Sequence, residues 1–350
     1  GDNQSIKATM LFRKKFRKIG RTISLNIEQS FNESNSTGLL YSINDFYNKS
    51  GVINFSDTTD QQKINATKSS ILVSKLAYTE QLAKNLTLEI SYGFNYNQSK
   101  NKVLSYDKAM DGKYSVLNTT YSNDFDLNII TNQTGSVLRY SKKKLSLSIG
   151  GDMAFANFKQ KDLIKDTLYN YSFTNFFPKA IFTFKFNANK RLNINYNGNT
   201  KQPGIQQLQP LADNNNPLFI QIGNPNLKQE FNHRFNLNFN NYQVLKNRGY
   251  NVGINGGFTN NAIRSSIFTD TTGKTTSQYI NINGDYNYSA RIGFNTKINK
   301  LDMYFNTNYS YNFNNNVSIV NTLRNETKND KHSISLSVNK DEEKKYNFWM

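Results

Sequence analysis

The stretch LTLEISYGFNY, residues 86–96, alternates apolar and polar side chains along its whole length. Successive side chains of a β-strand point to opposite faces, so this alternation predicts a strand. One face carries Leu86, Leu88, Ile90, Tyr92, Phe94 and Tyr96, and the other carries Thr87, Glu89, Ser91, Gly93 and Asn95. What the apolar face contacts decides the fold class.

The same alternation recurs along the chain. Shared faces carry Ile23, Leu25, Ile27 and Phe31; Leu145, Leu147 and Ile149; Leu192, Ile194 and Tyr196; Phe235, Leu237 and Phe239; and Leu301, Met303, Phe305, Tyr309, Tyr311 and Phe313. No comparable helical stripe is present. The expected strands have about 9 to 14 residues, whereas soluble strands have about 5 to 6 and tilted membrane strands need about 9 to 11. Strand length therefore favours a membrane barrel.

The opposite faces of these strands are rich in Asn, Ser, Thr and Gly, as at Ser333, Ser335 and Ser337. Such a face suits a water-filled lumen. Strands with one lipid face and one wet face must close on themselves, because every backbone donor and acceptor in lipid needs a partner within the protein. The alternative is a soluble sheet protein whose apolar faces pack together. We predict an all-β fold, an antiparallel up-and-down transmembrane β-barrel with about 14 to 17 strands present, which meets outer-membrane lipid.

Composition limits the alternatives. The 350 residues are only 37% hydrophobic, yet they include 25 Phe and 21 Tyr set in alternating strands, which argues against disorder. Cysteine is absent, which excludes disulfides and thiolate chemistry. No run approaches the roughly 18 apolar residues of a membrane helix. The net charge of +18 accompanies a strong Asn and Ile bias and is a weak functional signal by itself.

The connections fall into two populations. Short segments rich in Lys and Arg lie at 13–20, 80–85, 141–144, 187–191, 246–249 and 297–300, with a further tight turn expected at 48–51. Long polar segments lie at 53–69, 105–123, 158–175, 198–228, 259–277 and 314–331. This asymmetry is typical of bacterial outer-membrane barrels, whose short turns face the periplasm and whose long loops face outside. Segment 198–228 is expected to be the largest extracellular loop and to overhang the lumen.

Four of the five prolines, Pro203, Pro210, Pro217 and Pro225, lie in that loop. Proline fixes its own backbone angle and offers no ladder donor, so the cluster indicates a shaped, ordered loop. Gly223 and Asn224 suit a tight turn. The main interpretation is structural, and the alternative is ligand contact by Asn214, Asn215, Asn216 or Phe219.

Residues 191–242 carry the most specific motifs. The sequence reads Gln202-Pro203, Leu208-Gln209-Pro210 and Gly223-Asn224-Pro225-Asn226-Leu227-Lys228-Gln229-Glu230. These elements resemble the barrel of TonB-dependent outer-membrane receptors, with Gln209 and Gln229 as departures from the family pattern. KLAYTEQL, residues 75–82, is similar to a turn of the same receptor-like barrels, with Ala77 and Gln81 as departures.

The resemblance implies a receptor that takes up a scarce ligand, such as a siderophore, glycan, vitamin or peptide, with energy from the TonB system. It implies a plug domain inside a barrel of 22 strands. Neither a plug nor a TonB-contacting box is found in residues 1–350, so we expect the barrel segment of a receptor, truncated at both ends. The carboxyl-terminal KKYNFWM looks like the start of another strand.

Other function classes find less support. A passive pore or structural barrel subunit would need the same strands and stays open as an alternative. His233 and His332 lie on separate strands without metal-ligand spacing, and no nucleophile elbow or phosphate-binding loop is present. Lys and Arg concentrate in the turns, not between aromatic residues of one face as nucleic-acid binding would require. We therefore expect no enzyme, no catalytic or metal site, no cofactor and no nucleic-acid partner.

Overall fold

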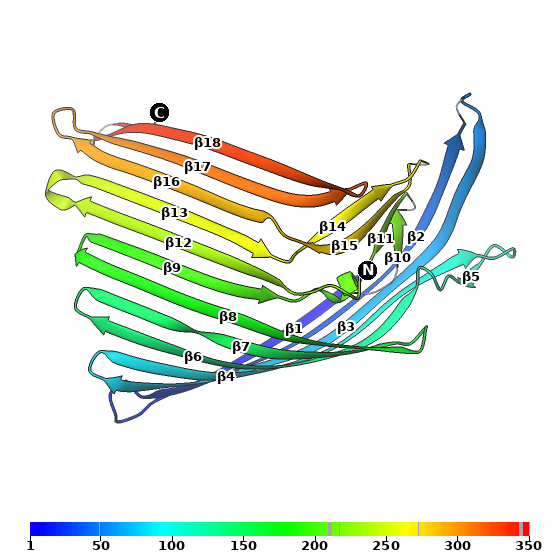
Figure 1. Cartoon of the computed structure of the whole chain (residues 1–350), viewed down its shortest axis with the longest axis horizontal. Coiled ribbons are helices and arrows are strands. Elements are labelled where there is room, and N and C mark those ends of the chain that lie inside the picture. The colour runs from blue at the N-terminus through cyan, green and yellow to red at the C-terminus, as the bar shows by residue number, and fades with distance from the viewer. Residues whose placement is uncertain (49, 209–211, 217, 272, 343–345, 350) are drawn as a thin grey trace.

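The computed structural model describes the chain except for residues 49, 209–211, 217, 272, 343–345 and 350 (Figure 1). Its strands belong to a single 19-stranded sheet. Helical structure among the described residues is confined to a short α1 (Ile205–Leu208) and a 3-10 turn, η1 (Val244–Lys246). The predicted all-β architecture is confirmed.

Most strands form one antiparallel meander, in which each strand pairs with the next long strand of the chain. Its members, in order, are β1 (Asp2–Lys15), β2 (Thr22–Tyr47), β3 (Ile53–Ala83), β4 (Leu86–Lys108), β6 (Asn123–Lys142), β7 (Leu145–Asp162), β8 (Thr167–Asn187), β9 (Lys190–Lys201), β12 (Glu230–Gln243), β13 (Arg248–Asn260), β16 (Asp285–Ile298), β17 (Met303–Val320), β18 (Leu323–Glu342) and β19 (Tyr346–Trp349). The expected short carboxyl-terminal strand is therefore present as β19.

Figure 1 shows that the meander curves strongly, with β1 and β2 passing behind the strands from β4 to β9. Within the described residues, β1 pairs only with β2 and β19 only with β18. Among these residues no pairing joins the two edges, so this ladder does not close by itself. Closure of the barrel stays a prediction.

The register confirms the predicted faces of β4. Ile90 and Tyr92 are 50% and 49% exposed on one face, whereas Ser91 between them is 8% exposed on the other. We call the face that carries Ile90 the outer face and the face that carries Ser91 the lumen face. Cross-strand pairing extends this assignment to every neighbouring strand, because directly paired residues share a face.

The tyrosines chosen from the sequence, Tyr92, Tyr96, Tyr196, Tyr309 and Tyr311, all lie on the outer face and none is buried. Both histidines also lie there. The Tyr196 hydroxyl is 3.1 Å from His233 Nδ1, and the Tyr309 hydroxyl is 2.8 Å from His332 Nδ1. Each pair joins diagonal neighbours on adjacent strands. A location at the bilayer interface, where a ring is buried and a polar tip stays wet, stays a prediction.

The two populations of connections lie at opposite ends of the sheet, as predicted (Figure 1). Short reversals follow β1, β3, β6, β8, β12 and β16 at one end, which we call the turn end. The connections after β2, β4, β7, β9, β13 and β17 lie at the other, the loop end. The prediction that the turn at 48–51 lies with the other short turns is wrong. It lies at the loop end, because β2 carries the chain from the turn end to the loop end.

Three of the expected long loops are mostly strand. Segment 53–69 belongs to β3, segment 158–175 is the β7–β8 hairpin, and segment 314–331 is the β17–β18 hairpin. Beyond the bilayer both faces meet water, so the alternation that marks a strand weakens while the backbone ladder continues. The expected strand lengths were therefore too short, and β3 reaches 31 residues.

The loop end also holds shorter strands: β5 (Tyr114–Leu117), β10 (Ala212–Asn216), β11 (Phe219–Ile222), β14 (Ala262–Thr269) and β15 (Thr275–Ile282). β5 extends β4. β14 pairs in parallel with the loop end of β17. β15 pairs with β14, and β11 pairs in parallel with β15. The loops after β9 and β13 are thereby joined into one ladder.

Chain topology predicts a labelling pattern in intact cells that carry a complete barrel. A cysteine introduced at Asn215, in the loop after β9, should react with a membrane-impermeant thiol reagent, and one at Lys143, in the β6–β7 turn, should not. Both should react after cell lysis, which controls for thiol reactivity. Labelling of the Lys143 variant from outside would reverse the assigned ends.

Candidate ligand-facing site

The loop between β9 and β12 is anchored by a small apolar cluster. Leu208 and Leu227 pack with Ile263 of β14, and Tyr171, Phe173 and Tyr279 lie against this cluster. Leu208 is fully buried and Leu227 is 5% exposed. Tyr171 and Phe173 project from the lumen face of β8, because they share a face with Lys179. The loop therefore folds inward over the lumen face.

Asn224 joins three parts of the loop end. Its backbone N–H donates to the carbonyl of Gln207 at 2.6 Å, and its side-chain amide donates to the carbonyl of Tyr279 at 2.9 Å. Its side-chain oxygen accepts from the N–H of Asn226 at 3.0 Å. An Asn side chain that bonds to the backbone two residues on is a common turn device. This residue ties α1, the turn after β11 and strand β15 together.

The end of the motif is held in the same way. The N–H of Lys228 donates to Asn281 Oδ1 at 2.7 Å, and Asn281 Nδ2 donates back to the carbonyl of Lys228 at 2.8 Å. Glu230 is 5% exposed, accepts from the N–H of Ile263 at 3.0 Å and lies 3.3 Å from Lys201 Nζ. These contacts support the structural interpretation of Asn224, Leu227, Lys228 and Glu230, and Gly223 is buried.

The structure describes only some of the residues that were predicted to contact a ligand. Phe219 is 40% exposed in β11 and pairs with Thr275. Asn214, Asn215 and Asn216 lie in β10, but their side chains fall outside the described part of the chain, as does Pro210 altogether. Pro203 is buried and Pro225 is exposed. A ligand-facing role for these residues stays a prediction.

The lumen face also carries a feature that the sequence motifs missed, which we call the asparagine wall. Its members come from β12, β13, β16 and β17 and share one face through their cross-strand pairing: Asn236, Asn238, Asn240, Asn251, Asn255, Asn295, Asn306, Asn308 and Asn312. The signal in the sequence is an Asn at every second position within an apolar alternation. By itself this signal predicts only a polar lumen face.

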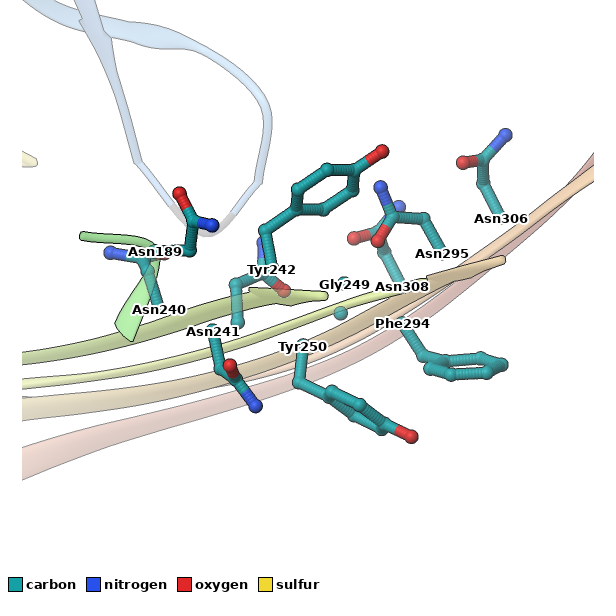
Figure 2. A pocket seen from close by; sticks show the side chains of 12 residues that line it. Asn189, Asn240, Asn241, Tyr242, Gly249, Tyr250, Phe294, Asn295, Asn306 and Asn308 are labelled. Carbon is teal, nitrogen blue, oxygen red and sulfur yellow. The ribbon is translucent and has the colours of Figure 1, made fainter. Parts of the chain in front are cut away.

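Glycines set the shape of this wall. Gly249 pairs with Asn295, and Gly293 pairs with Asn251. A β-carbon added at either glycine would lie 1.9 Å from the side-chain oxygen of its paired asparagine. The side-chain oxygens of Asn295 and Asn251 therefore occupy the space above these glycines. The same part of the lumen face borders a cavity of about 300 Å³ (Figure 2). Figure 2 also shows Tyr250 and Phe294 on the opposite side of the sheet.

Between β1 and β8 the lumen face also carries ion pairs. Arg139 contacts Glu89 at 2.7 Å, and Lys7 contacts Glu28 at 2.8 Å. Asp152 is 9% exposed, with Lys179 Nζ at 3.5 Å. Charged side chains also occur between β9 and β17, where Arg234 and Arg291 share the lumen face with the asparagines.

At the loop end, β3 and β4 border a cavity of about 410 Å³ whose lining includes Asp60, Lys108 and Lys274. Lys274 lies in the β14–β15 turn, so this hairpin comes close to the part of the sheet that β3 and β4 form. The Tyr114 hydroxyl donates to Asp60 at 2.7 Å and lowers the pKa of that carboxyl below its ordinary value, with help from Lys108.

The sheet combines an apolar outer face, a polar lumen face and an asymmetric set of connections. A family model described as "Outer membrane protein beta-barrel family" matches residues 14–349. The chain belongs to this family. Membership confirms the predicted barrel class and places the protein in the bacterial outer membrane.

Solved structures share this family's architecture. The copper transporter OprC is 11% identical with a TM-score of 0.61, over 97% of this chain and 50% of that one. The ferric citrate transporter FecA in its unliganded form is 10% identical with a TM-score of 0.58, over 97% and 47%. The siderophore receptor PiuA from Acinetobacter baumannii is 13% identical with a TM-score of 0.53, over 97% and 52%. These identities show fold alone.

The likeness in fold confirms the predicted resemblance to the barrels of TonB-dependent receptors. The barrel chain spans about half the length of the solved structures that it matches. No curated protein matches its sequence. No helix of the described residues is long and apolar enough to span a membrane. Within the same residues, no group of three or more His, Asp or Glu side chains could hold a metal ion.

Proposed function

We propose that this chain is the barrel segment of an outer-membrane receptor that takes up a scarce ligand. The observation that carries the proposal is the loop between β9 and β12, which folds inward over the lumen face and is anchored there by Leu208 and Leu227. A shaped, anchored loop at the outer mouth can hold a ligand, whereas a simple pore needs an open mouth. The fold shared with transporters and receptors supports the same proposal.

In the complete protein, further strands would pair with the open edges at β1 and β19. An outer-membrane transporter barrel has about 22 strands and a plugged lumen. A plug would lie against the lumen face, where ion pairs and asparagine amides offer polar contacts. The plug, the TonB partner and the ligand, whether siderophore, glycan, vitamin or peptide, are part of this proposal.

Conductance distinguishes a receptor from a passive pore. The complete protein inserted in a planar bilayer should hardly conduct ions, because a plug fills the lumen, and should conduct after moderate urea releases the plug. It should also retain a TonB carboxyl-terminal domain on an affinity column. A large open conductance without urea, together with no TonB binding, would establish the passive-pore alternative.

A further inference from the structure

A row of charged residues crosses four strands on the outer face near the loop end. Glu33 of β2 pairs with Lys68 of β3, Lys68 pairs with Lys100 of β4, and Lys100 pairs with Asp126 of β6. The two lysines are therefore directly opposite each other in the ladder. Like charges in that arrangement repel, so their side chains need separation or a shared counter-ion.

In the structure the lysines lean apart. Lys68 Nζ lies 2.8 Å from a Glu33 carboxylate oxygen, and Lys100 Nζ lies 3.9 Å from a carboxylate oxygen of Asp126. Both lysine side chains are 64% exposed. The carboxylates hold the ammonium groups to either side, and the space between them stays open to an anion.

These lysines line a groove of about 500 Å³, which we call the Lys68–Lys100 groove. The next row of outer-face residues also lines it. In the adjoining row Ile6 pairs with Phe31, Phe31 with Ser70, and Ser70 with Gln98. The short side chain of Ser70 leaves a hollow between larger neighbours. Ile6 and Phe31 are 69% and 51% exposed, so one wall of the groove is apolar and accessible.

The groove lies at the height of lipid headgroups. Lys100 follows Tyr96, the last residue of the apolar stretch on β4, by four residues. A strand rises about 3.3 Å per residue and a barrel strand tilts by about 40°, so each residue gains about 2.5 Å along the bilayer normal. The backbone of Lys100, and of Lys68 paired with it, therefore lies about 10 Å beyond the apolar band, on the outer side of the membrane.

We propose that the Lys68–Lys100 groove binds the phosphorylated headgroup of an outer-leaflet glycolipid of the lipid A type. The phosphate would accept charge-assisted hydrogen bonds from both ammonium groups and relieve their repulsion. Ser70 and Gln98 can donate further hydrogen bonds, and an acyl chain can lie along Ile6 and Phe31. An amphiphile uses both walls of the groove, whereas a soluble anion would use only the lysines. The inference depends on location in the outer membrane and not on transport.

Binding can be measured on the full chain, in its complete barrel, extracted from outer membranes in mild detergent. The probes are diphosphorylated lipid A and its dephosphorylated form, titrated and followed by native mass spectrometry. The Lys68→Gln/Lys100→Gln variant should bind the diphosphorylated form at least about tenfold more weakly, because it loses two charge-assisted hydrogen bonds. Dephosphorylated lipid A should bind wild type as weakly as this variant binds the phosphorylated form.

Two variants serve as controls. Lys159→Gln/Lys161→Gln removes the same charge from the outer face of β7, away from the groove, and should bind as wild type does. Lys68→Arg/Lys100→Arg keeps the charge and should retain binding. Heat-modifiable migration on a gel verifies folding of each variant. The proposal would be overturned if the Lys68→Gln/Lys100→Gln variant bound diphosphorylated lipid A as tightly as wild type, or if the β7 control lost as much binding as that variant. Displacement of lipid A by millimolar inorganic phosphate would also overturn it.

Discussion

Replacing Ile90 with arginine should severely impair assembly of the barrel. Ile90 is half exposed on the outer face, in the middle of the apolar stretch of β4. A cationic side chain near the bilayer midplane costs about 2 to 4 kcal/mol, because lipid offers the charge no partner. The fraction of folded, heat-modifiable protein in isolated outer membranes measures the effect.

Ser91→Arg is the matched control, one residue away on the same strand. Ser91 faces the lumen, and its hydroxyl lies 3.4 Å from the side chain of Asp152. An arginine there would enter a polar interior with a carboxylate close by, so the folded fraction should fall much less. Equal losses for the two variants would contradict the assignment of lipid and lumen faces.

Leu227→Ala should release the loop between β9 and β12 while the barrel wall stays folded. Leu227 is 5% exposed in a cluster with Leu208 and Ile263. Truncating a buried leucine costs about 2 to 5 kcal/mol, which is large for a loop held by one small cluster. Hydrogen exchange at β11 and β15 and protease cleavage within 202–229 should both rise by at least about tenfold.

The control for this variant is Lys228→Ala. The Lys228 side chain is exposed, and its hydrogen bonds to Asn281 come from the backbone, which alanine preserves. Protease cleavage and hydrogen exchange should stay at the wild-type level. If Leu227→Ala behaves as this control does, the apolar cluster does not hold the loop, and the main support for the proposed function is lost.

Strand faces were predictable because the rule behind them is local. Ile90 and Ser91 were assigned to opposite faces from alternation alone, and the register confirms both. The ends of the sheet followed from chain parity, since each strand that crosses the bilayer reverses the end at which the next connection lies. The turn at 48–51 is the exception, because a tight turn can lie at either end of the sheet and its length does not indicate which.

Loop structure was less predictable. Segments 158–175 and 314–331 are too polar to alternate clearly, and yet they form hairpins because the ladder continues past the membrane. The parallel pairing of β11 with β15 joins residues more than fifty positions apart, and no local pattern signals it. The proline cluster predicted an ordered loop, and the motifs within it contained Leu208 and Leu227, but the packing of these two residues against Ile263 was not predictable.

The sequence by itself determined the fold class, the two faces of the strands and the family resemblance. Alternation and turn motifs depend only on residues that are close together in the sequence. Tertiary structure alone decided the inward fold of the loop, the packing of Asn295 and Asn251 over glycines, and the pairing of Lys68 with Lys100. Each of these depends on which residue of one strand lies opposite which residue of the next. Cross-strand register is a property of paired strands, so it becomes visible only when the sheet has formed.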